Sequence, residues 1–212
     1  TRQLEQLRDE IRAADGQAEV WTLDVTARAE VERVAGQVLA RFGRVDIVVN
    51  NAGVMLPNPI EETRFDQWQQ QIDLNVSGLM NVIGAFTAAL VKAGAGAGPA
   101  DLVNVSSIAS KSVFPAFAVY CGTKAFVSHL SVNLRTELGA KGVRVSAIEP
   151  GIVGTELQSH VDYQGALDWL EATKANVEWL APEDVAEAIA FTVGLPKRVN
   201  LQQVTIMPTA QA

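Results

Sequence analysis

Short apolar runs and amphipathic helical segments alternate along almost the whole chain. The run VDIVVN at residues 45–50 is β-branched and apolar without an alternating pattern, which is typical of a strand buried on both faces of a parallel sheet. From that point on, each predicted strand except the last is followed by a helical segment, as parallel neighbours require. We therefore expect an α/β fold with one doubly wound parallel sheet and helices packed on both of its faces.

The element boundaries follow from apolar spacing and from residues that begin or end helices. Asp15-Gly16 ends the first helix, Thr26 caps the second, Gly43 stops it, and Pro182 opens the last. The predicted helices span residues 4–14, 26–42, 64–91, 120–138 and 182–194. The predicted strands span residues 19–23, 45–50, 102–105, 143–148 and 203–206.

Composition excludes several classes of protein. The 212 residues are 48% hydrophobic, which is enough for a buried core, and 17 Lys and Arg against 24 Asp and Glu leave no basic stripe for nucleic acid. Charge, Gly or Asn interrupts every apolar run before the length of about 18 residues that a membrane helix needs, so we expect no membrane partner. Cys121, His129 and His160 are too scattered for a metal site, and a single cysteine favours a reducing, cytoplasmic location.

The glycines at 94, 96 and 98 have the spacing of a phosphate-binding loop but the wrong context. Such a loop follows a strand and opens a helix, so that backbone N–H groups and the helix dipole face the anion. Here a predicted helix precedes the glycines and Pro99 leads into a strand. We interpret this segment as a plain connection.

Candidate catalytic side chains follow the strand at 102–105, where ligands bind in open α/β sheets. Ser106 and Ser107 end this strand, and Tyr120 and Lys124 share one face of the following helix because they are four residues apart. An ammonium near a phenol favours the phenolate and lowers the phenol's pKa toward neutrality. The alternative is a solvated pair on a helix surface, which this spacing also produces by chance.

Five motifs in one order connect the chain to a known family. They are NNAG at 50–53, DLNVSG around Asn75, LVNVSSIAS at 102–110, the Tyr120-x-x-x-Lys124 spacing, and Pro150-Gly151 with Thr155. With these motifs the sequence resembles the classical short-chain dehydrogenases/reductases. The resemblance implies a Rossmann-type domain over residues 1–212 and an oxidoreductase that moves hydride between a nicotinamide cofactor and an alcohol or carbonyl.

The resemblance also implies a role for each matching residue. Tyr120 is the general acid or base, Ser107 polarises the substrate oxygen, Lys124 lowers the Tyr120 pKa and binds the nicotinamide ribose, and the Asn75 backbone holds a relay water. The implied cofactor contacts are Asp24 and Val25 at the adenine, Asn50, Ala52 and Gly53 beneath the adenosine ribose, and Pro150, Gly151, Ile152 and Thr155 around the nicotinamide carboxamide, besides Tyr120 and Lys124.

Purely structural roles remain as alternatives for several of these residues. Asp24 could simply cap a turn with Thr26, and Gly53 could be an ordinary loop glycine. We interpret Ser106 as structural, Cys121 as a packing residue and Lys111 as a solvated loop charge.

The sequence departs from the family pattern at its start. It contains no TGxxxGxG turn for the cofactor pyrophosphate, and residue 1 falls in the helix after the family's second strand, so a strand-helix-strand unit is absent. Either an N-terminal segment precedes these residues, or the product is a non-catalytic fragment or pseudoenzyme unable to bind cofactor. The acidic or basic residue that separates NAD from NADP is absent with it.

Two further regions indicate substrate and cofactor. The segment at 158–180 is apolar and lies where the family covers a small or mid-sized organic substrate, although core or dimer packing explains it equally well. The tail VTIMPTAQA resembles bacterial NADP-dependent reductases of the clavaldehyde dehydrogenase type, which favours NADP.

The family resemblance also indicates an oligomeric state and raises alternative functions. We expect a homodimer or homotetramer that packs helices near 76–91 and 120–138. A lyase or epimerase with the same Tyr and Lys is a weaker alternative. A hydrolase built on Ser107 is disfavoured because the chain has neither a G-x-S-x-G elbow nor a suitably placed His.

Overall fold

A four-stranded parallel sheet forms the centre of the computed structural model, which describes residues 2–211. The strands lie side by side in chain order, and each neighbouring pair is parallel. They are β1 (Ile47–Asn50), β2 (Ala100–Val105), β3 (Val143–Pro150) and β4 (Gln203–Ile206). The predicted parallel sheet is therefore confirmed, with the last four predicted strands in place.

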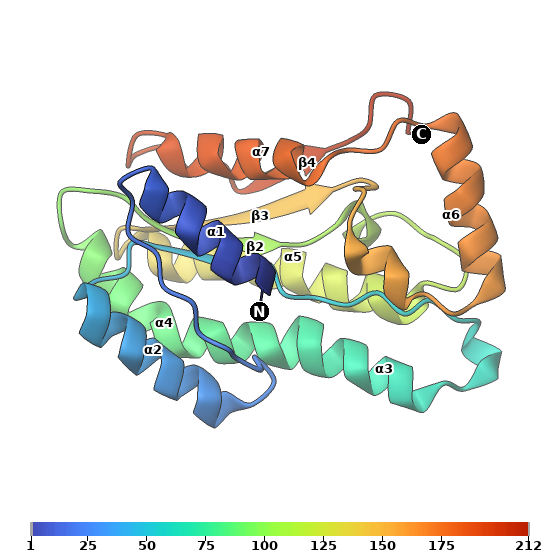
Figure 1. Ribbon diagram of the computed structural model, residues 1–212, viewed down its shortest axis with the longest axis horizontal. Coiled ribbons are helices and arrows are strands. Elements are labelled where there is room, and N and C mark those ends of the chain that lie inside the picture. The colour runs from blue at the N-terminus through green and yellow to red at the C-terminus, as the bar shows by residue number, and fades with distance from the viewer. Residues whose placement is uncertain (1, 212) are drawn as a thin grey trace.

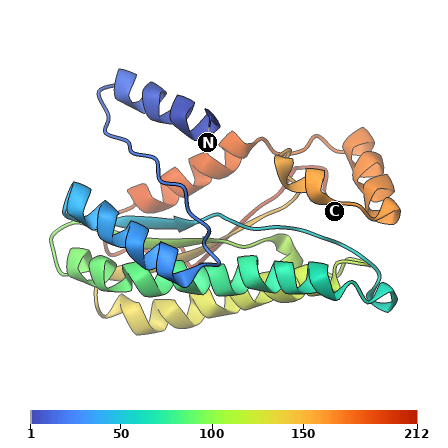
Figure 2. The same cartoon turned by 60° about the horizontal axis from the view of Figure 1, so that its bottom comes forward.

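Helices cover both faces of this sheet, as a doubly wound fold requires (Figures 1 and 2). Figure 2 shows α2, α4 and α5 below the sheet and α7 above it. The helices are α1 (Arg2–Ala13), α2 (Arg28–Phe42), α3 (Phe65–Ile72), α4 (Leu79–Gly94), α5 (Ala118–Gly139), α6 (Gln164–Asn176) and α7 (Pro182–Gly194). A π-helical turn, Asp73–Gly78, joins α3 to α4.

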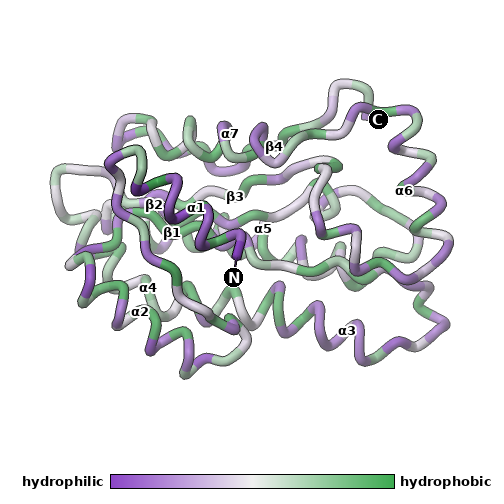
Figure 3. The backbone as a smooth tube through the Cα atoms, in the orientation of Figure 1, coloured by the Kyte–Doolittle hydropathy of each residue, from purple (hydrophilic) through white to green (hydrophobic). Residues whose placement is uncertain are grey.

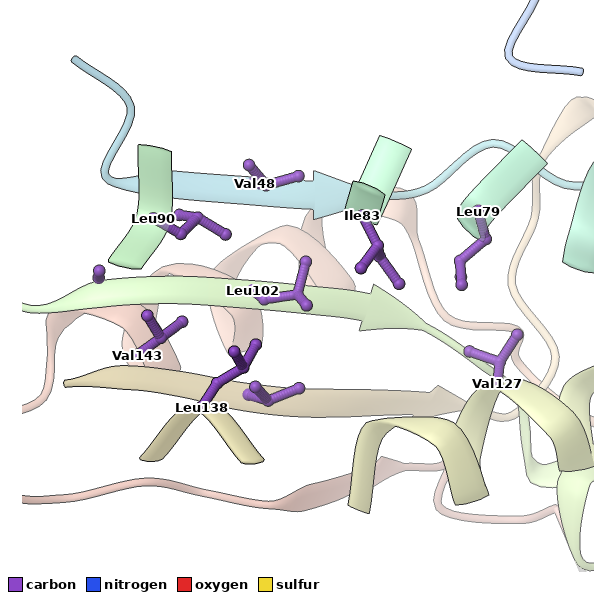
Figure 4. Packing of buried hydrophobic residues seen from close by; sticks show 10 residues of the cluster. Val48, Leu79, Ile83, Leu90, Leu102, Val127, Leu138 and Val143 are labelled. Atoms are coloured by element: carbon purple, nitrogen blue, oxygen red, sulfur yellow. The ribbon is translucent and has the colours of Figure 1, made fainter. Parts of the chain in front are cut away.

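The main core lies between the sheet and the pair α4 and α5 (Figure 4). Leu79, Ile83 and Leu90 of α4 share one face because they follow helical spacing, and they pack against Leu102 of β2 and its neighbours. Taken by length and hydropathy alone, the helical stretch Phe65–Gly94 could cross a membrane. The α4 part of this stretch packs Leu79, Ile83 and Leu90 against the sheet, so we interpret α4 as a core helix.

The predicted strand at 19–23 is wrong. This segment has extended backbone but no ladder, because none of residues 2–211 pairs with it. Trp21 packs edge-on against Phe42 of α2 instead, with ring centroids 6.3 Å apart. A strand is defined by its partner, and β propensity alone does not supply one.

The prediction that both faces of β1 are buried is also wrong. Val48 is buried under α4, whereas Ile47 and Val49 on the opposite face are 46% and 43% exposed. Helix α1 lies on that side of the molecule but buries none of its residues, and Figure 3 shows it as largely hydrophilic. Among the described residues, the face of β1 opposite α4 is therefore open.

A buried ion pair ties the sheet to α7. Asp101 of β2 and Arg144 of β3 are partners in the ladder, and the guanidinium donates two 2.7 Å hydrogen bonds to the carboxylate. Arg144 also donates to the carbonyl oxygens of Val193 and Leu195 where α7 ends, each at 2.7 Å. The glycine-rich stretch before β2 is a connection, as expected, and its Gly94 carbonyl accepts a hydrogen bond from Lys197.

Candidate active site

A cleft of about 1050 Å³ opens at the carboxyl ends of β1, β2 and β3. Parallel strands deliver the segments that follow them to one edge of the sheet, so motifs far apart in sequence meet there. The predicted site residues that line the cleft are Ala52 and Gly53 after β1, Ser107 after β2, Tyr120 and Lys124 of α5, and Pro150, Gly151, Ile152 and Thr155 after β3.

Tyr120 lies on the first turn of α5 and is only 6% exposed. Burial raises its pKa to about 12, because the phenolate is deprived of water, and the nearby Ser107 hydroxyl acts in the opposite direction. The sequence predicted a lowered pKa from Lys124, and in this structure the net direction is upward. The phenol is consequently a proton donor at neutral pH.

Lys124 is buried one turn further along the same helix, 7% exposed. Its Nζ donates a 3.0 Å hydrogen bond to the carbonyl oxygen of Val105 at the end of β2 and lies 5.8 Å from the centre of the Tyr120 ring. Burial lowers its pKa to about 8, because the ammonium is desolvated without a carboxylate partner. The alternative of a solvated surface pair is therefore wrong for this lysine.

The buried ammonium predicts a stability gain when Lys124 is replaced by methionine. The folded pKa of about 8 lies below the ordinary 10.5, so protonated Lys124 destabilises the fold at pH 7. We expect Lys124→Met to raise the free energy of unfolding at pH 7 by roughly 2–3 kcal/mol, since one pKa unit corresponds to about 1.4 kcal/mol. The gain should shrink as pH rises from 8 to 10.5.

Urea unfolding at several pH values measures this gain, and Lys92→Met on the exposed side of α4 is the matched control. Lys92→Met should show no such pH-dependent gain. A Lys124→Met protein that is no more stable than the parent at pH 7 would contradict the prediction.

Asn75 fixes the loop after β1 against α5. Its side-chain oxygen accepts from the Val54 backbone N–H at 2.8 Å, and its Nδ2 donates to the Val54 carbonyl at 2.9 Å and to Thr123 Oγ1 at 3.0 Å. Asn75 sits in the π-helical turn, a feature that frequently marks functional sites. It does not itself line the cleft.

Gly53 packs where a side chain would intrude on these groups. A Cβ at this position would lie 3.2 Å from Asn75 Oδ1 and 3.7 Å from Lys124 Nζ. The absence of a side chain therefore keeps the space in front of Lys124 open. Gly53 therefore has close neighbours that an ordinary loop glycine does not have.

The two serines after β2 have different surroundings. Ser107 lines the cleft, and its Oγ accepts a hydrogen bond from the Ala109 N–H, which caps a short 3₁₀ turn. Ser106 is buried, donates to the Lys124 carbonyl oxygen at 3.0 Å and contacts Ser128 Oγ at 2.8 Å. Its structural interpretation agrees with these contacts.

Glu149 is a central residue that the sequence reasoning missed. It is completely buried in β3 and accepts hydrogen bonds from Lys111 Nζ at 2.7 Å and Ser128 Oγ at 2.8 Å. Gln203 and Thr205 of β4 also donate to it. The carboxylate thereby joins the turn after Ser107, helix α5 and the last strand. Lys111 is an exposed loop charge, as expected, but its ammonium is paired with Glu149. A single acidic residue within the apolar strand before Pro150 is the signal that could have revealed it.

Three predicted cofactor residues lie outside the cleft lining. Asp24 is exposed and accepts hydrogen bonds from the Thr26 N–H at 2.9 Å and its Oγ1 at 2.8 Å, so the turn-capping alternative is what the structure contains. Val25 is half-buried beside it. Asn50 is buried and donates to Asn104 Oδ1 at 2.8 Å, across the β1 and β2 ladder. Asn50 therefore holds the end of β1, where the following loop begins, against β2.

Two further residues reach the cleft without having been predicted. His160, left uninterpreted from sequence, lies on its rim. Gln211 also lines the cleft, and its side-chain oxygen accepts a 2.9 Å hydrogen bond from the Ile152 backbone N–H. The family resemblance assigns Ile152 to the surroundings of the nicotinamide carboxamide. A carboxamide is therefore already the chemical partner of this N–H in the structure.

Cys121 is half-buried next to Tyr120, and burial raises the pKa of its thiol. A raised pKa keeps the thiol protonated and poorly nucleophilic. The packing interpretation of Cys121 agrees with this environment.

Comparison with known proteins gives the same family as the motifs. Residues 1–165 match the family model described as short chain dehydrogenase. NADP-dependent 3-hydroxy acid dehydrogenase YdfG of Escherichia coli (strain K12) is 35% identical over 210 residues, which are 99% of this chain and 82% of the relative. Sulfoacetaldehyde reductase 2 of Chromohalobacter salexigens is 38% identical over 191 residues, 90% of this chain and 74% of the relative.

A solved structure agrees over the whole chain. The closed form of serine dehydrogenase complexed with NADP⁺ superimposes with a TM-score of 0.87 at 34% identity, and the match covers 100% of this chain and 83% of that one. The Rossmann-like architecture is thus shared with an enzyme of known class. The chain belongs to the short-chain dehydrogenase family of oxidoreductases.

Proposed function

We propose that this protein transfers hydride between NADP(H) and a small or mid-sized alcohol or carbonyl, with Tyr120 as general acid and base. The observation that carries the proposal is the meeting of Ser107, Tyr120 and Lys124 in one cleft at the carboxyl edge of the sheet. The NADP-dependent relative and the NADP⁺-bound structural neighbour support the choice of cofactor.

In carbonyl reduction the chain's own groups act on the substrate oxygen. The nicotinamide cofactor, when bound, would supply the hydride to the carbonyl carbon. The protonated Tyr120 phenol donates its proton to the developing alkoxide, and the Ser107 hydroxyl donates a hydrogen bond to the same oxygen. Lys124 places its ammonium behind Tyr120 and holds the nicotinamide ribose hydroxyls. The Asn75 backbone, in the π-helical turn, holds a water that returns a proton to Lys124 from solvent.

The residues present fit the nicotinamide end of the cofactor. Gly53 leaves open space in front of Lys124, and the Ile152 N–H already binds a side-chain carboxamide, the same group that nicotinamide carries. Around that end Pro150, Gly151 and Thr155 line the cleft. We assign Asp24 and Val25 to the adenine, and Asn50, Ala52 and Gly53 to the adenosine ribose.

We propose that residues 1–212 form a single Rossmann-type domain. The sequence has no TGxxxGxG motif, and the outer face of β1 carries the exposed Ile47 and Val49. A non-catalytic fragment or pseudoenzyme unable to bind cofactor is the competing proposal.

The two proposals differ in whether carbonyl compounds oxidise NADPH. Purified full-length protein is mixed with NADPH and a panel of aldehydes and ketones, and absorbance at the nicotinamide band is followed while the alcohol product is quantified. We expect NADPH loss equal to alcohol formed, with little loss without carbonyl. Absence of both NADPH binding and turnover across the panel would favour the fragment or pseudoenzyme, whereas detectable NADPH binding would count against it.

A further inference from the structure

The half of the cleft beyond Tyr120 is walled by aromatic rings. Phe114 and Phe117, from the loop before α5, and Trp169 of α6 all line it. The ring centroids are 6.0 Å apart for Phe114 and Phe117, 5.9 Å for Phe114 and Trp169, and 5.7 Å for Phe117 and Trp169. Each ring therefore contacts the other two, in the tilted or edge-on geometry that aromatic groups prefer.

This aromatic wall, defined as Phe114, Phe117 and Trp169, is held in place by its surroundings. Between the two phenylalanines, Ala116 adopts a left-handed φ of 69°, and its carbonyl oxygen accepts a 2.9 Å hydrogen bond from the Asn58 N–H. Phe117 is 6% exposed, whereas Trp169 is 38% exposed and leaves a free face. A second cavity of about 260 Å³ borders the same three rings, which is ample room for one more aromatic ring.

The charges around the cleft are as informative as its apolar wall. Among the described residues, Lys124 is the one Lys or Arg side chain that lines the cleft, and Glu156 is the one carboxylate. The Lys124 ammonium is already hydrogen-bonded to the carbonyl oxygen of Val105 and lies 5.8 Å from the centre of the Tyr120 ring. His160 is an exposed residue on the rim. Within residues 2–211, no arginine lines the cleft to form the usual bidentate pair with a carboxylate or sulfonate of a substrate.

We infer that the substrate is an uncharged aryl aldehyde or ketone, or the corresponding alcohol, whose ring packs against the aromatic wall while its oxygen meets Tyr120 and Ser107. This inference rests on the proposed function. Burying an anion without a cationic partner is costly, and Glu156 together with the chain's net charge of −7 repels anions further. A neutral ring gains by leaving water at no such cost.

The inference separates this protein from two of its relatives. Those relatives are named for a 3-hydroxy acid and for sulfoacetaldehyde, which are anions. The shared motifs concern the chemistry at the carbonyl, whereas the wall and the missing cation concern the rest of the substrate.

Matched pairs of aldehydes test charge and ring separately. Initial rates of NADPH oxidation by the full-length protein are measured with benzaldehyde against 4-carboxybenzaldehyde, and with butanal against succinic semialdehyde. We expect kcat/KM to be at least about 100-fold higher for the neutral member of each pair and about 10-fold higher for benzaldehyde than for butanal. Equal rates within the pairs, or faster reduction of the anions, would overturn the substrate class while leaving the proposed function intact.

A variant locates the preference on the wall. Trp169→Ala is expected to lower kcat/KM for benzaldehyde about 10-fold with little effect on butanal, because only the aryl group uses the indole face. Trp21 packs on α2 and does not line the cleft, so Trp21→Ala should change kcat/KM for neither benzaldehyde nor butanal. An equal loss for both aldehydes in Trp169→Ala would contradict the ring contact. Failure of all four aldehydes and of the wider carbonyl panel would remove the proposed function and this inference together.

Discussion

Replacing Tyr120 by phenylalanine is expected to lower kcat for carbonyl reduction by about 10²- to 10⁴-fold, the range that general acid catalysis contributes. The phenol is buried, and its pKa of about 12 keeps it protonated at neutral pH, ready to donate to a developing alkoxide. Phenylalanine preserves the ring that packs with Met55, Phe117 and Ile152 but removes the proton. The loss should therefore appear in kcat, with the fold and NADPH binding retained.

Steady-state kinetics, NADPH titration by fluorescence and circular dichroism measure these three quantities. Tyr163→Phe is the matched control, because Tyr163 is the other tyrosine of the chain and does not line the main cleft. Its turnover should equal that of the parent. If Tyr120→Phe reduced the carbonyl panel at the parental rate, Tyr120 would not be the general acid.

Replacing Arg144 by methionine is expected to lower the free energy of unfolding by roughly 3–5 kcal/mol, the cost of leaving one partner of a buried ion pair alone. Asp101 and Arg144 are 1% and 4% exposed, and the guanidinium also serves carbonyl groups at the end of α7. Burial already raises the pKa of Asp101, and the hydrogen bonds from Arg144 oppose that rise. Without Arg144 the pKa rises further.

The sign of the pH dependence follows from that rise. An aspartate with a raised folded pKa destabilises the fold when it is ionised, so the deficit of Arg144→Met should shrink as pH falls through the raised pKa. Urea unfolding at pH 5 and pH 8 measures it. Arg28→Met breaks the exposed Arg28–Glu32 pair on α2 and should leave stability unchanged. If Arg144→Met unfolded at the same urea concentration as the parent, the buried pair would not be needed for stability.

Local features of the sequence determined the fold class and most of the candidate site. The β-branched run at 45–50 and the helical spacing of Leu79, Ile83 and Leu90 depend on near neighbours in the chain, and both elements are in the structure. The four-residue spacing of Tyr120 and Lys124 placed them on one side of α5 for the same reason.

Properties that depend on distant segments were decided only by the tertiary structure. Residues 19–23 have strand propensity but no partner to pair with, and Ile47 and Val49 are apolar but face an uncovered side of β1. The pKa of Tyr120 moves upward because burial outweighs the hydrogen bond with Ser107, and burial is set by the packing of several elements. Glu149 joins three segments that are far apart in the chain. Periodicity and spacing are encoded locally, whereas desolvation, strand pairing and buried networks exist only once the chain has folded.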